Sequence, residues 1–332
     1  MMSATGIGSM PGTSVSEAVA VVAGELPDLP HLVELPARGA GADMIGRTAA
    51  LLVEVAPDFG LQTVPTGWQR TGGRTPEMRR ARSWLGEDLD RAEQVFADSS
   101  GDFKIQICGP WTWAAGVEDT SGRRLVRDAG FMADLSDAWA AAAIAHFADV
   151  RRRLPHRRLV LQCDEPTVPA ILSGRIPTRS GLGRLAAVPE SEVSATLRRA
   201  LRAHDVTTIL HCCDTFPFGV ARLAGFSAIS YDCSPRGPDR QPGASDTIDA
   251  LAQTWESGIG LLAGVVPTRF DIGVDALWKS VRDWWSRTGL PASDLVRVGF
   301  SPACGLAGVT ASRSRSALAD ATELHRRAVD GL

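Results

Sequence analysis

Residues 207–213 read Thr-Thr-Ile-Leu-His-Cys-Cys, a short apolar run that ends in reactive side chains. The run begins with β-branched and aliphatic residues, which is typical of a parallel strand buried on both faces. Its last residues include His211 and Cys213, two positions apart. Functional groups at the carboxyl end of such a strand are characteristic of α/β barrels and open α/β sheets. We therefore interpret His211 and Cys213 as candidate ligands of one metal ion.

The rest of the chain repeats this strand pattern, with helical periods between the apolar runs. We predict eight strands, at residues 4–8, 31–34, 103–108, 158–163, 207–213, 227–231, 260–266 and 296–300. Eight strands that are each followed by a helix are the count for a (β/α)8 TIM-type barrel. No linker or long repeat interrupts the pattern, so the prediction is one α/β domain over residues 1–332. Residues 57–76, rich in Gly, Pro and Thr, are predicted as a surface loop that carries Trp68 and Arg70.

Composition restricts the class of protein. The chain has 332 residues and a formal net charge of −3, so it lacks the basic footprint of a nucleic-acid-binding protein. Its first residues do not resemble a signal peptide, and no apolar run is long enough for a membrane helix. The six cysteines are too few for a disulfide framework in a chain of this length. We expect a soluble cytoplasmic protein with its thiols reduced.

Metal ligands are predicted after three different strands. Cys304 follows the last predicted strand and would join His211 and Cys213 at the same end of the barrel. One nitrogen and two sulfurs suit zinc, and three protein ligands with an open fourth position are the pattern of a catalytic site. Asp232 or Cys233, after the sixth strand, can supply a fourth ligand. The alternative is that these cysteines are small core residues and that His211 is a buried, hydrogen-bonded histidine.

A substrate with a thiol, an amine and a carboxylate would fit the neighbouring residues. A zinc ion with two thiolate ligands is suited to binding a substrate thiol, since coordination removes the thiol proton. Asp164, within Asp164-Glu165-Pro166, and Glu34 place carboxylates at strand ends, where they could bind an ammonium group. The turn at Gly8 and Ser9 could hold a carboxylate. Helix capping at residues 164–165 and a plain turn at Ser9 are the structural alternatives.

Five short motifs carry a family resemblance. In chain order they are Ile7-Gly8-Ser9-Met10-Pro11, Cys108-Gly109-Pro110-Trp111-Thr112, Gln162-Cys163-Asp164-Glu165-Pro166, His211-Cys212-Cys213 and Pro302-Ala303-Cys304-Gly305-Leu306. Together they resemble the catalytic domain of cobalamin-independent methionine synthase, a (β/α)8 barrel whose zinc binds homocysteine for methylation. The resemblance implies four zinc ligands: His211, Cys213, Cys304 and, where the family has a glutamate, Asp232. It implies five contacts to homocysteine: Ile7, Gly8 and Ser9 at its carboxylate, and Glu34 and Asp164 at its amine.

The chain departs from the family pattern on the methyl-donor side. Ala170 stands where the family has a folate-contacting glutamate, and Arg269 stands where it has a proton-donating histidine. The family's Arg-Cys folate pair and its additional amino-terminal barrel have no counterpart in the sequence. The donor could therefore be methyltetrahydrofolate bound differently, or a methylcorrinoid delivered by a corrinoid-carrying partner protein.

The hypothesis from sequence is a zinc-dependent methyltransferase that makes methionine from homocysteine. One alternative is a metal-free barrel enzyme similar to uroporphyrinogen decarboxylase. The other is a non-catalytic barrel that binds zinc and thiols.

Overall fold

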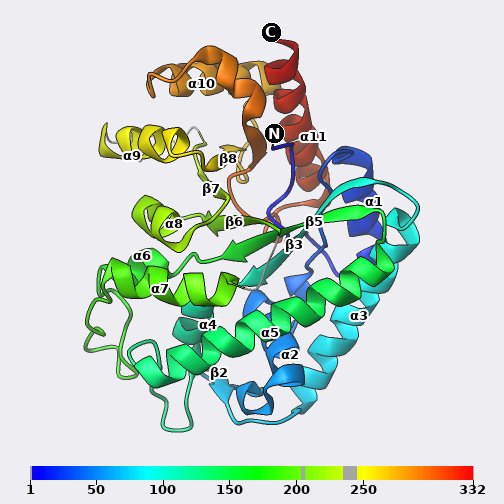
Figure 1. Ribbon diagram of the computed structural model, residues 1–332. Helices are drawn as coiled ribbons and strands as arrows, with labels where there is room; N and C mark the ends of the chain where they lie inside the picture. The colour runs from blue at the N-terminus through cyan, green and yellow to red at the C-terminus, as the bar shows by residue number, and fades with distance from the viewer. Residues whose placement is uncertain (1, 203–205, 235–244, 332) are drawn as a thin grey trace.

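The computed structural model describes residues 2–202, 206–234 and 245–331 (Figure 1). Its centre is a curled parallel sheet of six strands in the order β3-β5-β6-β7-β8-β9. The strands are β3 (Gly101–Cys108), β5 (Arg157–Asp164), β6 (Thr207–Cys212), β7 (Ala228–Asp232), β8 (Gly260–Val266) and β9 (Gly299–Pro302). Six of the eight predicted strands are therefore present, and all pair in parallel with their neighbours. The α/β class is confirmed.

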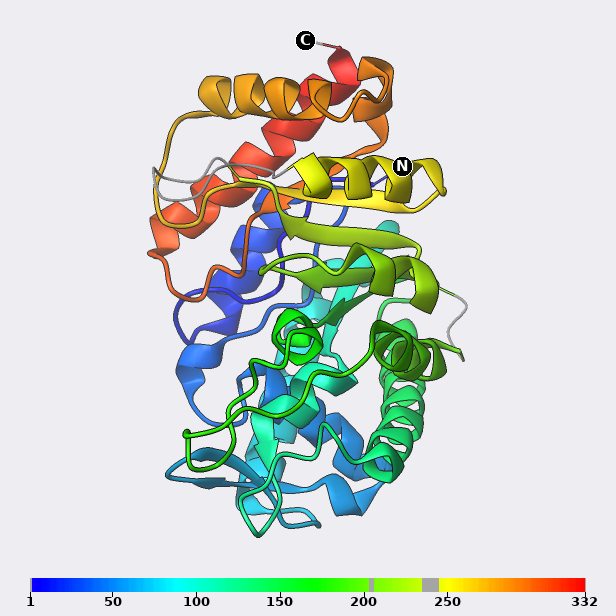
Figure 2. The same ribbon diagram turned by 90° about the vertical axis from the view of Figure 1, so that its left-hand side faces the viewer.

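Helices cover the outside of this sheet (Figures 1 and 2). They are α1 (Val15–Glu25), α2 (Met44–Val55), α3 (Pro76–Phe96), α4 (Pro110–Gly116), α5 (Ala129–Arg153), α6 (Val168–Leu172), α7 (Glu190–Leu201), α8 (Phe218–Ala224), α9 (Ser245–Glu256), α10 (Val274–Ser286) and α11 (Ala311–Asp330). Short 3-10 turns are η1 (Pro36–Arg38), η2 (Pro57–Phe59) and η3 (Ala292–Arg297). Helix α5 packs against both α2 and α3 on one side of the sheet, and α11 packs against β9.

The prediction of a closed eight-stranded barrel is wrong for the residues that the structure describes. Residues 4–8 form no strand and residues 31–34 take part only in isolated bridges, Ser9 with Glu34 and His31 with Lys104. Backbone hydrogen bonds place them between the edge strands, since Thr5 N donates to Phe300 O (3.0 Å) in β9. The sheet is thus a six-stranded half-barrel, flanked at its open side by two irregular segments.

Glycine and proline explain why these two segments do not become regular strands. Gly8 has φ of +146°, a conformation that side-chain-bearing residues rarely adopt. Pro30 precedes the second segment and Pro36 follows it, and proline has no N–H to donate to a ladder. Both segments are apolar because they are buried in the centre of the molecule, which explains why their sequences resemble strands.

The predicted loop at 57–76 is also corrected by the structure. It contains strands β1 (Leu61–Val64) and β2 (Gly67–Arg70), an antiparallel hairpin, and β2 also pairs with β4 (Val117–Glu118). Trp68 is buried in this small sheet, and its Nε1 donates to Asp43 Oδ1 (3.1 Å). Asp43 also caps α2, because its Oδ1 accepts from Ile45 N and Gly46 N (3.1 and 3.0 Å). The hairpin therefore fixes the start of the helix that borders the site.

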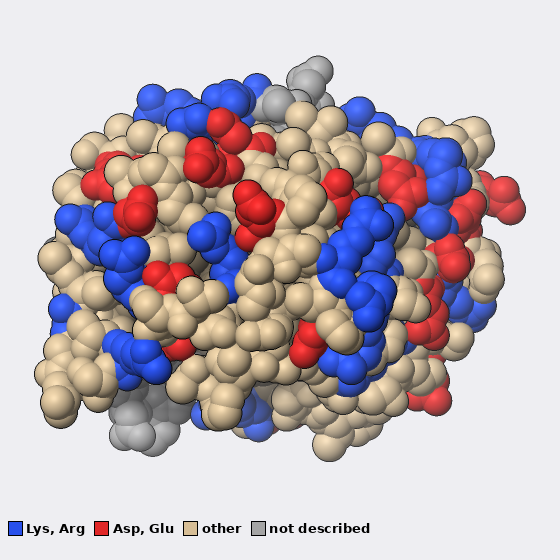
Figure 3. All heavy atoms as spheres, turned by 90° about the horizontal axis from the view of Figure 1, so that it is seen from below, with Lys and Arg blue, Asp and Glu red and all other residues tan. Residues whose placement is uncertain are grey.

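No helix in the described part of the chain is long and apolar enough to cross a membrane. On the face seen in Figure 3, basic and acidic side chains are interspersed, with one band of basic side chains to one side. The three tryptophans of α10, Trp278, Trp284 and Trp285, are buried.

Candidate functional site

One pocket gathers most of the predicted site residues at the carboxyl ends of the strands. It has a volume of about 270 Å³ and is mostly apolar in lining. Seven predicted residues line it: Ile7, Ser9, Glu34, Asp164, His211, Cys213 and Cys304. Asp164 ends β5 and pairs in register with His211 of β6, so neighbouring strands bring these two together. The side chains come from five separate parts of the sequence and meet because parallel strands end on the same side.

A buried lysine lies beneath the pocket. Lys104 in β3 is fully buried, and its Nζ donates to Gln162 Oε1 (2.7 Å) and Ile7 O (3.1 Å). Gln162 Nε2 donates in turn to Asp164 Oδ1 (2.7 Å) and Ile7 O (2.8 Å). This network holds the Asp164 carboxylate and the Ile7 carbonyl in place. The sequence interpretation missed Lys104, although a rare lysine inside an apolar strand is a recognisable anomaly.

The two pocket carboxyls share this buried environment. Burial raises the pKa of Glu34, while the charge of Arg47 and a hydrogen bond from Gln106 oppose the shift. Burial also raises the pKa of Asp164, the charge of Glu34 adds to it, and Gln162 and Lys104 oppose it. Burial lowers the pKa of Lys104, against the attraction of Asp164 and Glu34. A cation bound between the two carboxyls would favour their ionised forms, so the pocket is suited to an ammonium group.

The Ser9 turn is held by the chain on both sides. Glu34 N donates to Gly8 O (3.1 Å), and Leu306 N donates to Ser9 O (2.9 Å). A Cβ at Gly8 would lie 2.8 Å from the Gln106 side chain, so glycine is required by space as well as by its φ. A Cβ at Gly305 would collide with Ser9 Oγ, which explains the glycine after Cys304. Gly8 itself does not line the pocket but shapes the turn that presents Ser9 to it.

Two thiols, those of Cys213 and Cys304, line the pocket. The neighbouring Cys213 thiol, the backbone N–H of Gly305 and the charge of Arg269 lower the pKa of Cys304 to about 7, despite burial and the charge of Asp232. The interaction with Cys304 and burial raise the pKa of Cys213. Of the two, Cys304 is therefore the one that carries thiolate character near neutral pH.

His211 is held as a neutral imidazole. Its Nδ1 is 3.0 Å from Ser230 Oγ, and burial, with a smaller effect from Lys104, lowers its pKa to about 3. A neutral imidazole with one nitrogen fixed by a hydrogen bond is the form that ligates metals.

The predicted fourth ligand is not gathered with the others. Asp232 Oδ1 accepts from Ser234 N (2.9 Å) and Ser234 Oγ (2.6 Å), and Asp232 does not line the pocket. Cys233 lines a different pocket with Val265 and Trp284. Across residues 2–202, 206–234 and 245–331, no group of three or more His, Cys, Asp or Glu side chains is arranged to hold a metal ion. The donors share one pocket without the spacing of an assembled ligand set.

Glu165 has a structural role, unlike its neighbour Asp164. It is fully buried, and its carboxyl accepts hydrogen bonds from Trp111 N (3.0 Å) and Thr112 N (2.7 Å) at the start of α4. Burial raises its pKa to about 7, against these hydrogen bonds. A Cβ at Gly109 would collide with this carboxyl. The capping alternative from the sequence thus applies to Glu165, and Trp111 is packed in the core beside it.

Comparisons with known proteins find a likeness of fold. No protein-family model matches the chain, and no curated protein matches its sequence. Among solved structures, a B12-independent methionine synthase from Shewanella sp. W3-18-1 in complex with selenomethionine is similar, with a TM-score of 0.60 and 11% sequence identity. The similarity covers 100% of each chain. The resemblance predicted from the five motifs is therefore confirmed in the fold, and over its whole length this chain is built like a B12-independent methionine synthase.

Proposed function

We propose that the protein is a methyltransferase that transfers a methyl group to the thiol of homocysteine and so produces methionine. The observation that carries this proposal is the meeting of two kinds of group in one pocket. Cys213, Cys304 and His211 would bind sulfur, and Glu34 and Asp164 would bind the amine; all five line the pocket. The fold similarity to a methionine synthase supports the same reaction class.

The chain's own residues would position the amino acid. Glu34 and Asp164 would bind the ammonium group, which restores the ionised forms that burial disfavours. The Ser9 turn would hold the carboxylate, and Ile7 would line the side of the bound molecule. Holding the thiol and the methyl donor in line would contribute much of the rate acceleration.

The set of His211, Cys213 and Cys304 fits zinc in its chemistry. One imidazole and two thiolates are ligands that zinc accepts, and all three side chains line one pocket. His211 is neutral and anchored by Ser230. We propose His211, Cys213 and Cys304 as zinc ligands, with Asp232 as the fourth after side-chain rearrangement. A zinc ion there would supply the lowering of the substrate thiol's pKa that lets it react at neutral pH.

The size of the pocket bears on the methyl donor. Its volume of about 270 Å³ lies just below the range of roughly 300–1,000 Å³ that is typical of pockets for drug-sized ligands. Pro36, Met44 and Ala307 form part of its wall. It suits homocysteine and a methyl group, so the bulk of the donor would remain outside. This favours a methylcorrinoid on a partner protein over methyltetrahydrofolate bound inside the pocket.

The two irregular segments also support a finer description of the fold. Residues 4–8 and 31–34 are hydrogen-bonded between β9 and β3, at the places of the first two strands of a (β/α)8 barrel. We propose that the chain is a single-domain variant of that barrel, in which irregular segments stand in place of the first two strands.

The test is a methyl-donor panel. Zinc-loaded protein with homocysteine is offered methylcobalamin and methyltetrahydrofolate separately, and methionine is measured. Methionine formation from methylcobalamin, abolished in Cys304→Ser, is the expected result. Binding of homocysteine without turnover of either donor would favour the non-catalytic thiol-binding barrel. Failure to bind homocysteine would rule out both the homocysteine methyltransferase and the non-catalytic thiol-binding barrel.

A further inference from the structure

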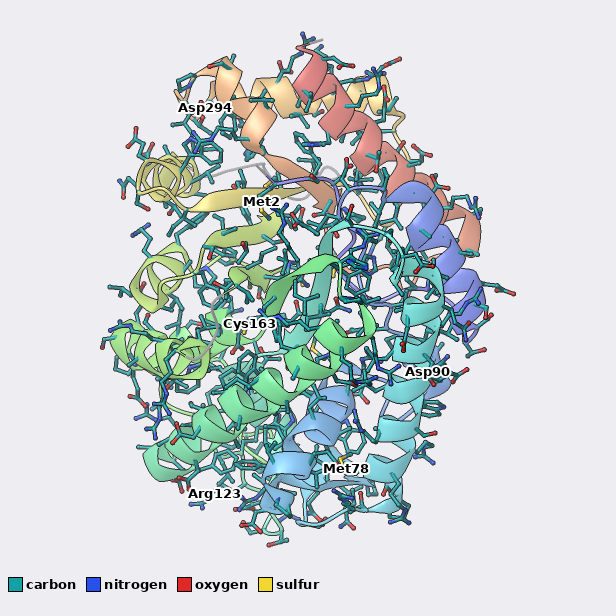
Figure 4. The ribbon with its side chains drawn as sticks, turned by 45° about the vertical axis from the view of Figure 1, so that its right-hand side comes forward. Met2, Met78, Asp90, Arg123, Cys163 and Asp294 are labelled. Carbon is teal, nitrogen blue, oxygen red and sulfur yellow. The ribbon has the colours of Figure 1, made fainter. Side chains whose placement is uncertain are left out.

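A chain of buried charges runs from helix α3 to the pocket. Asp88 in α3 is fully buried, and two arginines hold its carboxylate. Arg38 Nη1 lies 2.9 Å from Asp88 Oδ1, and Arg47 Nη1 lies 2.5 Å from Asp88 Oδ2. Figure 4 shows α3 beside α2, with Met78 near its lower end and Asp90 further along. Asp88 therefore connects α3 to both segments that border the pocket.

Arg47 lies at different distances from its two acidic neighbours, Asp88 and Glu34. It makes a short, charge-assisted hydrogen bond to Asp88, whereas its Nε is 3.7 Å from Glu34 Oε1, beyond hydrogen-bond distance. Arg47 is 6% exposed, so its charge depends on protein partners rather than on water. The charge of Arg47 therefore attracts the Glu34 carboxylate, but Arg47 Nε does not donate a hydrogen bond to it. The same carboxylate lines the pocket.

Arginine and carboxylate groups in low dielectric favour close, bidentate pairing. Without the charge of Asp88, Arg47 would pair closely with Glu34, and Glu34 would no longer be available to a bound cation. Arg38 contributes to this arrangement, because it pairs with Asp88 and also donates to Thr13 O (3.1 Å). Asp88 thus pairs with two arginines, which would pair with other carboxylates if Asp88 were absent.

We propose that Asp88 determines the preference of the pocket for a thiol that bears an ammonium group. By holding Arg47 through a hydrogen bond, it keeps the Glu34 carboxylate free for the amine of the substrate. Asp88 does not line the pocket, so it is a positioning residue that acts through Arg47. This inference rests on the proposed function, since it names what makes that site selective for an amino acid.

The test compares two ligands that differ only in the amine. Homocysteine and 4-mercaptobutanoate share the thiol, the chain and the carboxylate. Their dissociation constants are measured by calorimetry with zinc-loaded full-length protein. Wild type is expected to prefer homocysteine. Asp88→Asn should weaken homocysteine binding by about tenfold or more and leave 4-mercaptobutanoate binding unchanged, as expected for loss of a charged hydrogen bond.

Arginine variants separate this role from a purely structural one. Arg47→Met alone leaves Asp88 paired with Arg38 and should keep or increase the preference for homocysteine. Adding Arg47→Met to Asp88→Asn should restore the preference, because Arg47 then no longer competes with the substrate for Glu34. If Asp88→Asn does not fold, as judged by circular dichroism, a loss of preference in Arg47→Met overturns the inference.

The outcomes also distinguish this inference from the proposed function. A wild type that binds neither thiol overturns both. A wild type that prefers homocysteine, with the same preference in Asp88→Asn, overturns only the role of Asp88. Equal weakening of both ligands in Asp88→Asn, without rescue by Arg47→Met, assigns Asp88 a structural role and overturns the inference.

Discussion

Cys213 and Cys304 line the same pocket, although 90 residues lie between them in the chain. Cys213 follows β6 and Cys304 follows β9, and both side chains line the pocket that contains Asp164. Two soft ligands and a carboxyl group therefore belong to the lining of one pocket. The predictions below test the parts of this arrangement separately.

Replacing Cys304 should remove metal and activity together. Cys304→Ser takes away the sulfur that has thiolate character, so we expect zinc content to fall well below one equivalent and methyl transfer to fall at least about a hundredfold. Zinc is measured by elemental analysis. Cys212→Ala is the matched control, because Cys212 is fully buried and burial raises its pKa to about 12. A Cys304→Ser protein with full zinc and activity would contradict the assignment.

Lys104→Met should destabilise the fold strongly. The change leaves the buried Gln162 Oε1 without its charged donor and leaves Asp164 without a buried counter-charge. Breaking such a buried pair costs about 3–5 kcal/mol, measurable by urea denaturation. Lys279 is the chain's other lysine and is exposed on α10, so Lys279→Met should change stability by less than about 0.5 kcal/mol. Equal effects of the two substitutions would argue against a network under the pocket.

Acid should destabilise the protein partly through His146. Burial lowers the pKa of His146 to about 3, so between pH 6.5 and 3 the unfolded chain binds a proton that the folded protein does not. Stability from this group is therefore lost as the pH falls, by about 1.4 kcal/mol per pH unit. His146→Leu should flatten the pH dependence of the unfolding free energy by that amount.

Only the difference between wild type and His146→Leu isolates this histidine. The pKa of Glu165 is raised to about 7, so this carboxyl acts with the opposite sign and loses its contribution as the pH rises. Unfolding curves at pH 7, 6 and 5 suffice. Parallel curves for the two proteins would show that His146 is charged in the folded state.

Gly109→Ala should disturb the start of α4. The new Cβ would collide with the Glu165 carboxyl, and overpacking of this kind costs about 1–3 kcal/mol. Gly24→Ala is the control, because it lies in α1 with no atom within 4 Å of the new Cβ. That change should stabilise the protein by about 0.4–1 kcal/mol. Thermal unfolding compares the two, and a neutral Gly109→Ala would contradict the tight packing.

Much of the site could be predicted because the ends of the strands can be recognised in the sequence. The apolar run before His211 identified β6, and parallel pairing then placed Asp164 beside it. Cys304 was assigned to the same end by the same logic and lines the same pocket. These residues could be placed because the apolar pattern of each strand and the parallel order of the strands can both be inferred from a single sequence.

The remaining errors have identifiable physical causes. Residues 57–76 resemble a loop because they are rich in glycine and proline, and two short strands, β1 and β2, were missed there. The partners of Lys104 lie 58 and 97 residues away, so its role depends on tertiary contacts that no local pattern contains. The side chain of Asp232 turns to Ser234, a local hydrogen bond that competes with the predicted metal role.

The central claim is that a soft metal and a thiol amino acid meet in this pocket. The most direct measurement is the absorption spectrum of cobalt-substituted protein during titration with homocysteine. We predict a sulfur-to-cobalt charge-transfer band in the protein alone, which grows and saturates at one equivalent of homocysteine. Cobalt that binds without a sulfur band, or a spectrum that homocysteine leaves unchanged, would contradict the account.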